Sequence, residues 1–146
     1  MFGRSYDDFN VGEEILHWPG KTITESDNNF FSLLTMNHHP VHLDTEYSKR
    51  QQHGKILVVG TYIFSLVVGQ SVRDISGQAV ANLSYENVLH VGSSFIGDTI
   101  YSKTTVLSKR LSQSNKRQGV VSVETTAWNQ KDEVVLRFSR SLLVPV

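Results

Sequence analysis

The segment Gly60–Ser71 (GTYIFSLVVGQS) constrains this chain most, because it is apolar on nearly every face of the helix that it would form. A helix of that kind is buried on all sides or spans a membrane, and this one is too short to span. A buried strand is the alternative, since Val, Ile and Phe favour strands. We favour a helix because Gly60 and Gly69 frame the segment and it exceeds the usual length of a buried strand.

Five further segments have the residue types and the alternation of β-strands. Four follow the apolar segment and one precedes it, within the ranges Ala79–Val91, Thr99–Arg110, Val120–Asn129, Val134–Val144 and Glu14–Thr24. Residues Ser112–Gly119 predict a polar hairpin loop, and Asn129–Glu133 predicts a tight turn. An antiparallel sheet with one face to cover can curl around one wholly apolar helix. We therefore predict an α+β fold, with a curved antiparallel sheet wrapped around a central apolar helix.

Short helices are predicted before the apolar segment. Thr24 can cap a helix over Glu25–Leu34, with Asp27 at the spacing of a capping box. Pro40 disfavours helical geometry at the residue before it, so no long helix continues there, and Asp44 can cap one more short turn. The sequence has no linker, repeat or low-complexity stretch, so residues 1–146 are predicted to form one domain.

The composition argues against several kinds of partner and site. Basic and acidic residues number 14 each, so the formal net charge is zero and nucleic acid is not expected as a partner. There is no cysteine, which excludes disulfides, thiolate metal sites and a cysteine nucleophile. No apolar stretch is long enough to span a membrane, and the first residues carry early acids instead of an apolar signal core. We therefore expect a cytoplasmic protein with no membrane partner.

Three of the six histidines, His38, His39 and His42, cluster in one short segment. Histidine titrates nearest to neutral pH, so the cluster predicts an acid–base site. A solvated polar loop is the plain alternative, and a zinc site of three imidazoles is another. Because Pro40 breaks the helical spacing that would aim the rings at one point, we predict no metal.

Gly60 is the second candidate, because it would begin the apolar helix. The first amides of a helix have no partner within it, and the helix dipole is positive at that end. Such an end can stabilise negative charge that develops on a carbonyl oxygen, and glycine lets a substrate approach the backbone closely. A glycine required only for packing is the alternative at this position.

Three segments together resemble the MaoC-like, or (R)-specific, enoyl-CoA hydratases. Asn37–Asp44 reads N-H-H-P-V-H-L-D and resembles that family's D-x-N-P-x-H-x-D segment. Gly54–Gly60 resembles the family's segment that ends in His-Gly before the central helix, and Phe95–Thr99 resembles its V-x-x-G-D-T/E segment. The three occur in matching order and spacing, so the resemblance covers the chain from about residue 7 to residue 145.

The resemblance implies a hotdog fold that pairs into homodimers, and an enzyme that adds water to, or removes it from, the double bond of an enoyl-CoA. In the family an aspartate and a histidine five residues later hold the water. The histidine position falls on His42, the aspartate position on Asn37 and the family's asparagine position on His39. The family's proline falls on Pro40, and its histidine before the helix glycine is replaced by Val59.

These departures leave three interpretations open, because an amide cannot accept a proton from water as a carboxylate can. Asn37 orients the water while His42 transfers the proton; or His39 takes one acid–base role beside His42; or the site binds acyl thioesters without catalysis. We favour the first two, with the thioester carbonyl at the Gly60 amide.

The acyl group is expected to lie along Tyr62 and Ile63, and Pro40 and Val59 are also expected to contact the substrate. No cofactor is expected, because the CoA thioester is itself the substrate. The alternatives to a hydratase are a non-catalytic acyl-thioester binding module and a hotdog thioesterase. A thioesterase usually places a carboxylate on the central helix, and the segment Gly60–Gly69 has none.

Overall fold

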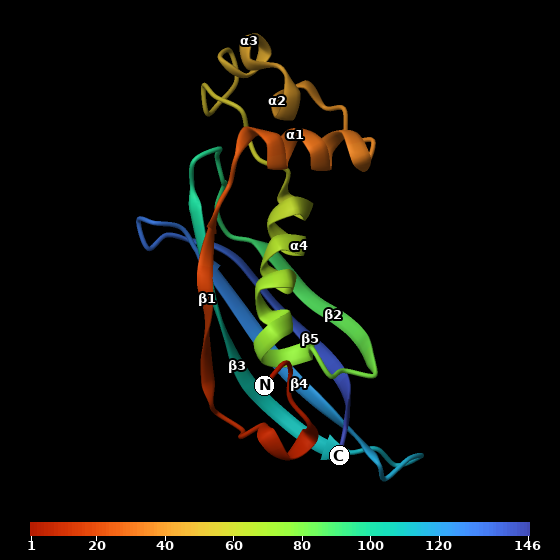
Figure 1. Ribbon diagram of the computed structural model, residues 1–146. Coiled ribbons are helices and arrows are strands. Elements are labelled where there is room, and N and C mark those ends of the chain that lie inside the picture. Colours follow the sequence, from red (N-terminus) through yellow and green to blue (C-terminus); the bar gives the residue numbers. More distant parts are fainter.

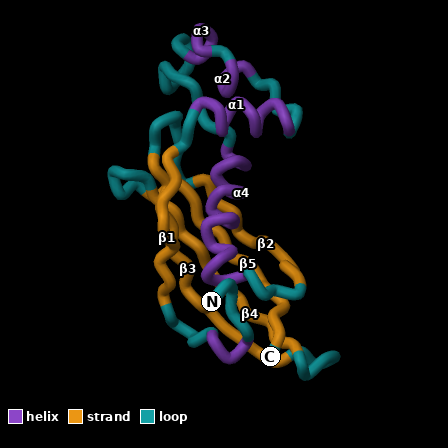
Figure 2. Tube along the Cα trace, in the orientation of Figure 1, coloured by secondary structure: helices purple, strands orange, loops and turns teal.

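The computed structural model describes residues 1–146 and is built on one five-stranded antiparallel sheet in the order β1-β3-β4-β5-β2. The strands are β1 (Glu14–Thr22), β2 (Ala81–His90), β3 (Thr99–Leu111), β4 (Gln118–Trp128) and β5 (Val134–Pro145). The sheet curves around one long helix, α4 (Gly60–Ser71), which lies along its inner face (Figure 1). Figure 2 shows the same arrangement as one layer of strands behind one helix. The predicted α+β fold is therefore confirmed.

All five predicted strands are present, with small differences at their ends. The loop predicted over Ser112–Gly119 is shorter than expected. Gln118 and Gly119 already belong to β4, where they pair with Pro145 and Val144 of β5. The long C-terminal strand continues the sheet to this point, while the Gln118 amide donates to the Asn115 carbonyl and the Gln118 carbonyl accepts from the Ser112 amide within the loop.

The sheet buries alternate residues against α4. In β4 every second residue is buried, including Val121, Val123, Thr125 and Ala127. This period of two is what places one set of side chains on the inner face. The apolar core therefore runs along the length of α4, from a group near its start that includes Ile63 to a group beyond its end that includes Ile75.

Helix α4 is not buried on all sides, contrary to the prediction. Ile63, Val67 and Ser71 form its fully buried stripe, while Thr61 and Ser65 are exposed and its other apolar residues are half-buried. A single sheet can cover only the side of the helix that faces it, so the opposite side stays open. None of the helices has the length and apolar character needed to cross a bilayer.

Three short helices cover the end of the sheet at which α4 begins (Figure 1). They are α1 (Glu25–Leu34), α2 (Pro40–Leu43) and α3 (Thr45–Ser48). The predicted capping box at the start of α1 is confirmed, since the Asp27 amide donates to Thr24 Oγ1 and the Thr24 amide donates to Asp27 Oδ2. The hydrogen bond from Lys21, followed by that from the Thr24 amide, lowers the pKa of Asp27 to about 2. Asp44 caps α3 as predicted.

A buried polar chain crosses the sheet at the far end of α4. His17 of β1 is fully buried, and its Nδ1 lies 2.8 Å from Asp74 Oδ2 in the π-helical turn Val72–Ser76 that follows α4. His17 Nε2 lies 2.7 Å from Thr104 Oγ1, which in turn lies 2.8 Å from Thr125 Oγ1. Burial, partly opposed by Asp74, lowers the pKa of His17, so the neutral ring donates to Asp74 and accepts from Thr104.

Candidate functional site

A cavity of about 140 Å³ lies where α4 begins, beside α2. It is lined by five chain segments: α2, the residues that lead into α4, the first turn of α4, the end of β2 with the loop after it, and the start of β5. The lining residues are His42, Leu57, Val58, Gly60, Ile63, His90, Gly92, Ser93, Ser94 and Val135. An apolar floor with a few polar groups converging on it is typical of a small-molecule site.

His42 is held in one orientation by the backbone. Its Nδ1 lies 2.7 Å from the Leu57 carbonyl oxygen, and the Leu57 amide donates to the Val41 carbonyl at 3.1 Å. A carbonyl oxygen can only accept, so His42 Nδ1 carries the hydrogen and Nε2 of the neutral ring keeps its lone pair. Nε2 has no partner in the protein, so it is available to accept a proton from a ligand in the cavity.

Asn28 of α1 joins the two parts of the site. Its side chain is buried, with Oδ1 accepting from the Val59 amide and Nδ2 donating to the His42 carbonyl, both at 3.0 Å. One amide thereby fixes the start of α4 relative to α2. The capped α1 helix positions this side chain, so the cap at Thr24 contributes indirectly to the geometry of the site.

The start of α4 presents unpaired donors to the cavity. The amides of Tyr62 and Ile63 donate to the Val59 carbonyl, whereas the amide of Gly60 precedes the first internal helix bond. Val59 caps the helix without a side-chain hydrogen bond, so its side chain leaves these amides unbonded, and the His90 ring lies beside Gly60. The helix dipole adds partial positive charge at this point.

The structure brings three of the predicted site residues to this cavity: His42, Gly60 and Ile63. Asn37 and His39 are close in the chain but do not line it. The Asn37 side chain accepts from the His39 amide at 3.4 Å, and His39 Nδ1 caps α2 by accepting from the Val41 amide at 3.1 Å. Both residues use their polar atoms locally, as short polar side chains at helix starts commonly do.

The three other predicted substrate contacts also lie outside the cavity. Pro40 is the first residue of α2, and Val59 is buried in the core. Tyr62 packs edge-on against Phe31 of α1 at 5.5 Å between ring centroids. Burial, and then the nearby Asp27 carboxylate, raise the pKa of Tyr62 to about 12. None of these three side chains lines the cavity.

The zinc alternative meets no suitable geometry. The His39 and His42 rings lie 6.0 Å apart between centroids in an edge-to-face arrangement, and each Nδ1 already has a backbone partner. No three side chains of the ligating types are arranged to hold a metal ion.

Sequence reasoning missed His90, Ser94 and Asn28. His90 ends β2, Ser94 follows in the loop, and Asn28 lies within α1. Only the packing of β2 and α1 against the start of α4 brings them to His42. The one available signal was local: Asn28 is a polar residue on the face of a predicted helix that also carries Phe31.

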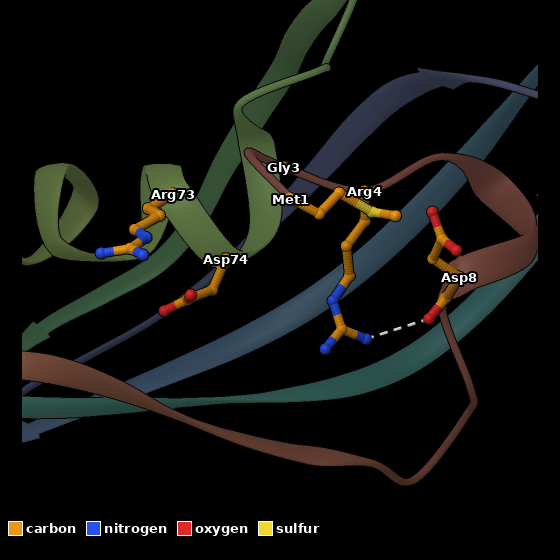
Figure 3. A pocket seen from close by; sticks show the side chains of 6 residues that line it. All are labelled: Met1, Gly3, Arg4, Asp8, Arg73 and Asp74. Atoms are coloured by element: carbon orange, nitrogen blue, oxygen red, sulfur yellow. Dashed lines mark hydrogen bonds between the residues drawn. The ribbon is translucent and has the colours of Figure 1, made fainter.

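A second cavity, of about 330 Å³, lies at the opposite end of α4 (Figure 3). Met1, Gly3, Arg4, Asp8, Arg73 and Asp74 line it. Arg4 is already paired, because it donates to the Asp8 carbonyl at 2.9 Å and to Glu13 at 2.8 Å. This cavity has no histidine, whereas His42 and His90 both line the cavity at the start of α4. The His42 cavity is therefore the better candidate.

Known proteins of similar sequence match this chain over most of its length. Residues 8–129 match the family model described as "MaoC like domain". The mesaconyl-CoA hydratase of Cereibacter sphaeroides is 32% identical over 142 residues, which are 97% of this chain and 41% of that protein. The chain spans about 40% of the length of the curated relatives that it matches.

Solved structures share the fold over almost the whole chain. A MaoC domain protein of Chloroflexus aurantiacus superposes with a TM-score of 0.94 at 30% identity, covering 99% of this chain and 41% of its own. A Mycobacterium tuberculosis protein described as a double hotdog fold gives a TM-score of 0.90 at 23% identity, covering 99% of this chain and 44% of its own. The second likeness concerns the fold alone and confirms the predicted hotdog arrangement.

Proposed function

The chain belongs to the MaoC-like domain family, and on that premise we propose that it adds water to, or removes it from, the α,β-double bond of an acyl-CoA thioester. One observation carries the proposal. The Leu57 carbonyl holds His42 Nδ1–H, so the unpaired Nε2 of His42 shares a cavity with the first amide of α4. A proton acceptor and an oxyanion donor on one cavity are the two groups that hydration of an enoyl thioester needs.

The reaction follows from these two groups. The thioester carbonyl accepts a hydrogen bond from the Gly60 amide, which stabilises the enolate charge that forms as water adds to the β-carbon. His42 Nε2 takes the proton that the water loses, and returns it in the dehydration direction. An oxyanion donor contributes about 10²–10³ in rate and an acid–base group about 10²–10⁴. The proposed steps use only groups of the protein and the substrate, so no cofactor enters them.

A hydrolytic alternative finds less support in the cavity. Hydrolysis of the thioester directs a nucleophile to the carbonyl carbon, and in hotdog enzymes a carboxylate commonly assists it. No Asp or Glu lines the cavity, and none lies on α4. For the same reason no acidic side chain of the cavity would repel a substrate whose acyl part carries a carboxylate, such as mesaconyl-CoA.

A substrate panel tests the reaction type. The protein is mixed with crotonyl-CoA, mesaconyl-CoA and 3-hydroxybutyryl-CoA, and enoyl absorbance and free thiol are followed together. The proposal predicts loss or gain of enoyl absorbance without thiol release. Thiol release without hydration would identify a thioesterase and overturn the proposal. Binding of the esters without either signal would identify a binding module and overturn it equally.

We also propose that two copies of the chain pair through β2. This strand is an edge of the sheet with unpaired backbone groups, and Leu83, Leu89 and Val91 on or beside it are more than half exposed. An apolar edge strand is a template for pairing with another strand. Pairing there would also cover α4 on its open side and enlarge a cavity that is small for a whole ligand, since such pockets measure about 300–1,000 Å³.

Sedimentation velocity tests the pairing. The chain should sediment at twice its mass of 16.4 kDa, and Leu89→Lys should shift it toward the single chain. Leu111→Lys is a matched control, because Leu111 is similarly exposed at the end of β3, away from that edge. A wild-type protein that sediments as one chain at micromolar concentration would overturn this part of the proposal.

A further inference from the structure

His90 lies at the end of β2, directly against the first residue of α4. A Cβ atom added to Gly60 would stand 3.1 Å from His90 Cε1, 3.3 Å from its Nδ1 and 3.4 Å from its Nε2. These three atoms form the nitrogen-bearing edge of the imidazole, so that edge faces Gly60. His90 and His42 thus line the same cavity from opposite elements, one from β2 and one from α2.

Ser94, which also lines this cavity, carries a second polar group without a partner in the protein. Its residue is 4% exposed, and its hydroxyl oxygen has no hydrogen-bond partner in the protein. A buried hydroxyl without a partner is unfavourable, so buried polar side chains are nearly always paired. A ligand oxygen in the cavity would supply the missing partner.

We infer that His90 is a catalytic residue, the second acid–base group of the hydration, and that it donates the proton that the α-carbon receives. The inference rests on the proposed function. Asn37 stands where the family has a carboxylate, and an amide cannot transfer the second proton. In this chain that proton-transfer group would come from the end of β2 and not from the segment around His42.

The step balances without any further reactant. The water oxygen forms a bond to the β-carbon as one O–H bond breaks, and that proton passes to His42 Nε2. The π electrons move toward the thioester carbonyl, whose oxygen is held at the Gly60 amide, and then form a C–H bond at the α-carbon with the proton of protonated His90. The product is the 3-hydroxyacyl thioester, and His42 and His90 return to their starting states by exchanging one proton each with solvent.

Kinetics of two His90 variants test the inference, with crotonyl-CoA and mesaconyl-CoA as probes. His90→Gln keeps hydrogen-bonding capacity but cannot titrate, so kcat should fall about 10²-fold or more with KM within about threefold of wild type. The dependence of kcat/KM on pH should also differ between His90→Gln and the wild type, because the variant lacks one acid–base group. His90→Ala should regain activity when free imidazole is added, which a merely structural role would not allow.

The controls separate this inference from the proposed function. His38→Gln is the matched control, because His38 is an exposed histidine outside the cavity and its loss should leave kcat unchanged. If the wild type hydrates neither probe, the proposed function fails. The role of His90 alone is overturned by a different result, in which the wild type is active and His42→Ala is inactive. In that case kcat of His90→Gln stays within threefold of wild type with the same pH profile, and imidazole does not stimulate His90→Ala.

Discussion

The imidazole of His42 donates from Nδ1 to the carbonyl oxygen of Leu57 across 2.7 Å, and this one contact decides which nitrogen faces the cavity. The carbonyl belongs to the segment that leads into α4, and the Leu57 amide returns a hydrogen bond to Val41, the neighbour of His42. The ring therefore cannot turn over without breaking a contact between α2 and that segment. The backbone presets the tautomer in which Nε2 is the base.

The first prediction concerns that tautomer. Long-range ¹H–¹⁵N correlation spectra of protein labelled at histidine nitrogens should show neutral His42 with its hydrogen on Nδ1, because the Leu57 carbonyl can only accept. His42→Gln removes the signals and thus assigns them. A neutral His42 with its hydrogen on Nε2 would contradict the proposed base.

The second prediction concerns Asn28, which orients the site without lining it. In Asn28→Asp an oxygen replaces Nδ2 and faces the His42 carbonyl at about the observed 3.0 Å, so one hydrogen bond becomes a repulsion. The free energy of unfolding should fall by about 1–3 kcal/mol, and kcat should fall with it. Urea unfolding and initial rates measure both.

Asn29→Asp is the matched control, because Asn29 is the exposed neighbour of Asn28 on α1. Its free energy of unfolding should stay within about 0.5 kcal/mol of wild type. If the two variants behave alike, Asn28 does not hold α2 to the start of α4.

The third prediction uses two glycines of α4. Gly60→Ala keeps the amide donor but places a methyl group 3.1–3.4 Å from the His90 ring, so the ring must move by a few tenths of an ångström. We expect kcat to fall about tenfold with little loss of stability, since small misplacements of reacting groups are costly. Gly69→Ala meets nothing within 4 Å, so it should stabilise the helix by about 0.5–1 kcal/mol and leave kcat unchanged. Equal kcat values in the two variants would contradict the packing of His90 on Gly60.

The fourth prediction concerns pH and the buried His17. Burial holds its pKa in the folded protein below the ordinary 6.5, so the unfolded chain binds a proton that the folded protein does not. The free energy of unfolding should therefore fall as pH drops below about 6.5. In His17→Gln, which keeps hydrogen-bonding capacity but does not titrate, that part of the pH dependence should be lost. Urea unfolding between pH 5 and pH 7.5 measures the difference, and an unchanged slope in His17→Gln would contradict the assignment.

Local features of the fold were predictable from the sequence because local interactions determine them. The cap at Thr24 and Asp27 fixes the start of α1, and the alternation of buried residues identifies the strands. The burial of α4 was overestimated, because the hydropathy of a segment does not tell how much of its surface one chain can cover. Thr61 and Ser65 mark the side that the sheet leaves open.

The site was only partly predictable. His42 and Gly60 were found because a histidine cluster and a glycine at a helix start each carry a local signal. Asn37 and His39 were placed in the site by the family resemblance, and in this chain their side chains accept hydrogen bonds from nearby backbone amides around Pro40. His90 carries no local signal, since only the pairing of β2 with β5 and the packing of α4 bring it to the cavity.

The measurement that tests the account most directly is the rate at which His42→Ala hydrates an enoyl-CoA that the wild type accepts. With Nε2 of His42 as the base, kcat should fall by about 10²–10⁴ while thermal unfolding stays cooperative. A His42→Ala protein that hydrates the same thioester at a rate within threefold of wild type would contradict the central claim.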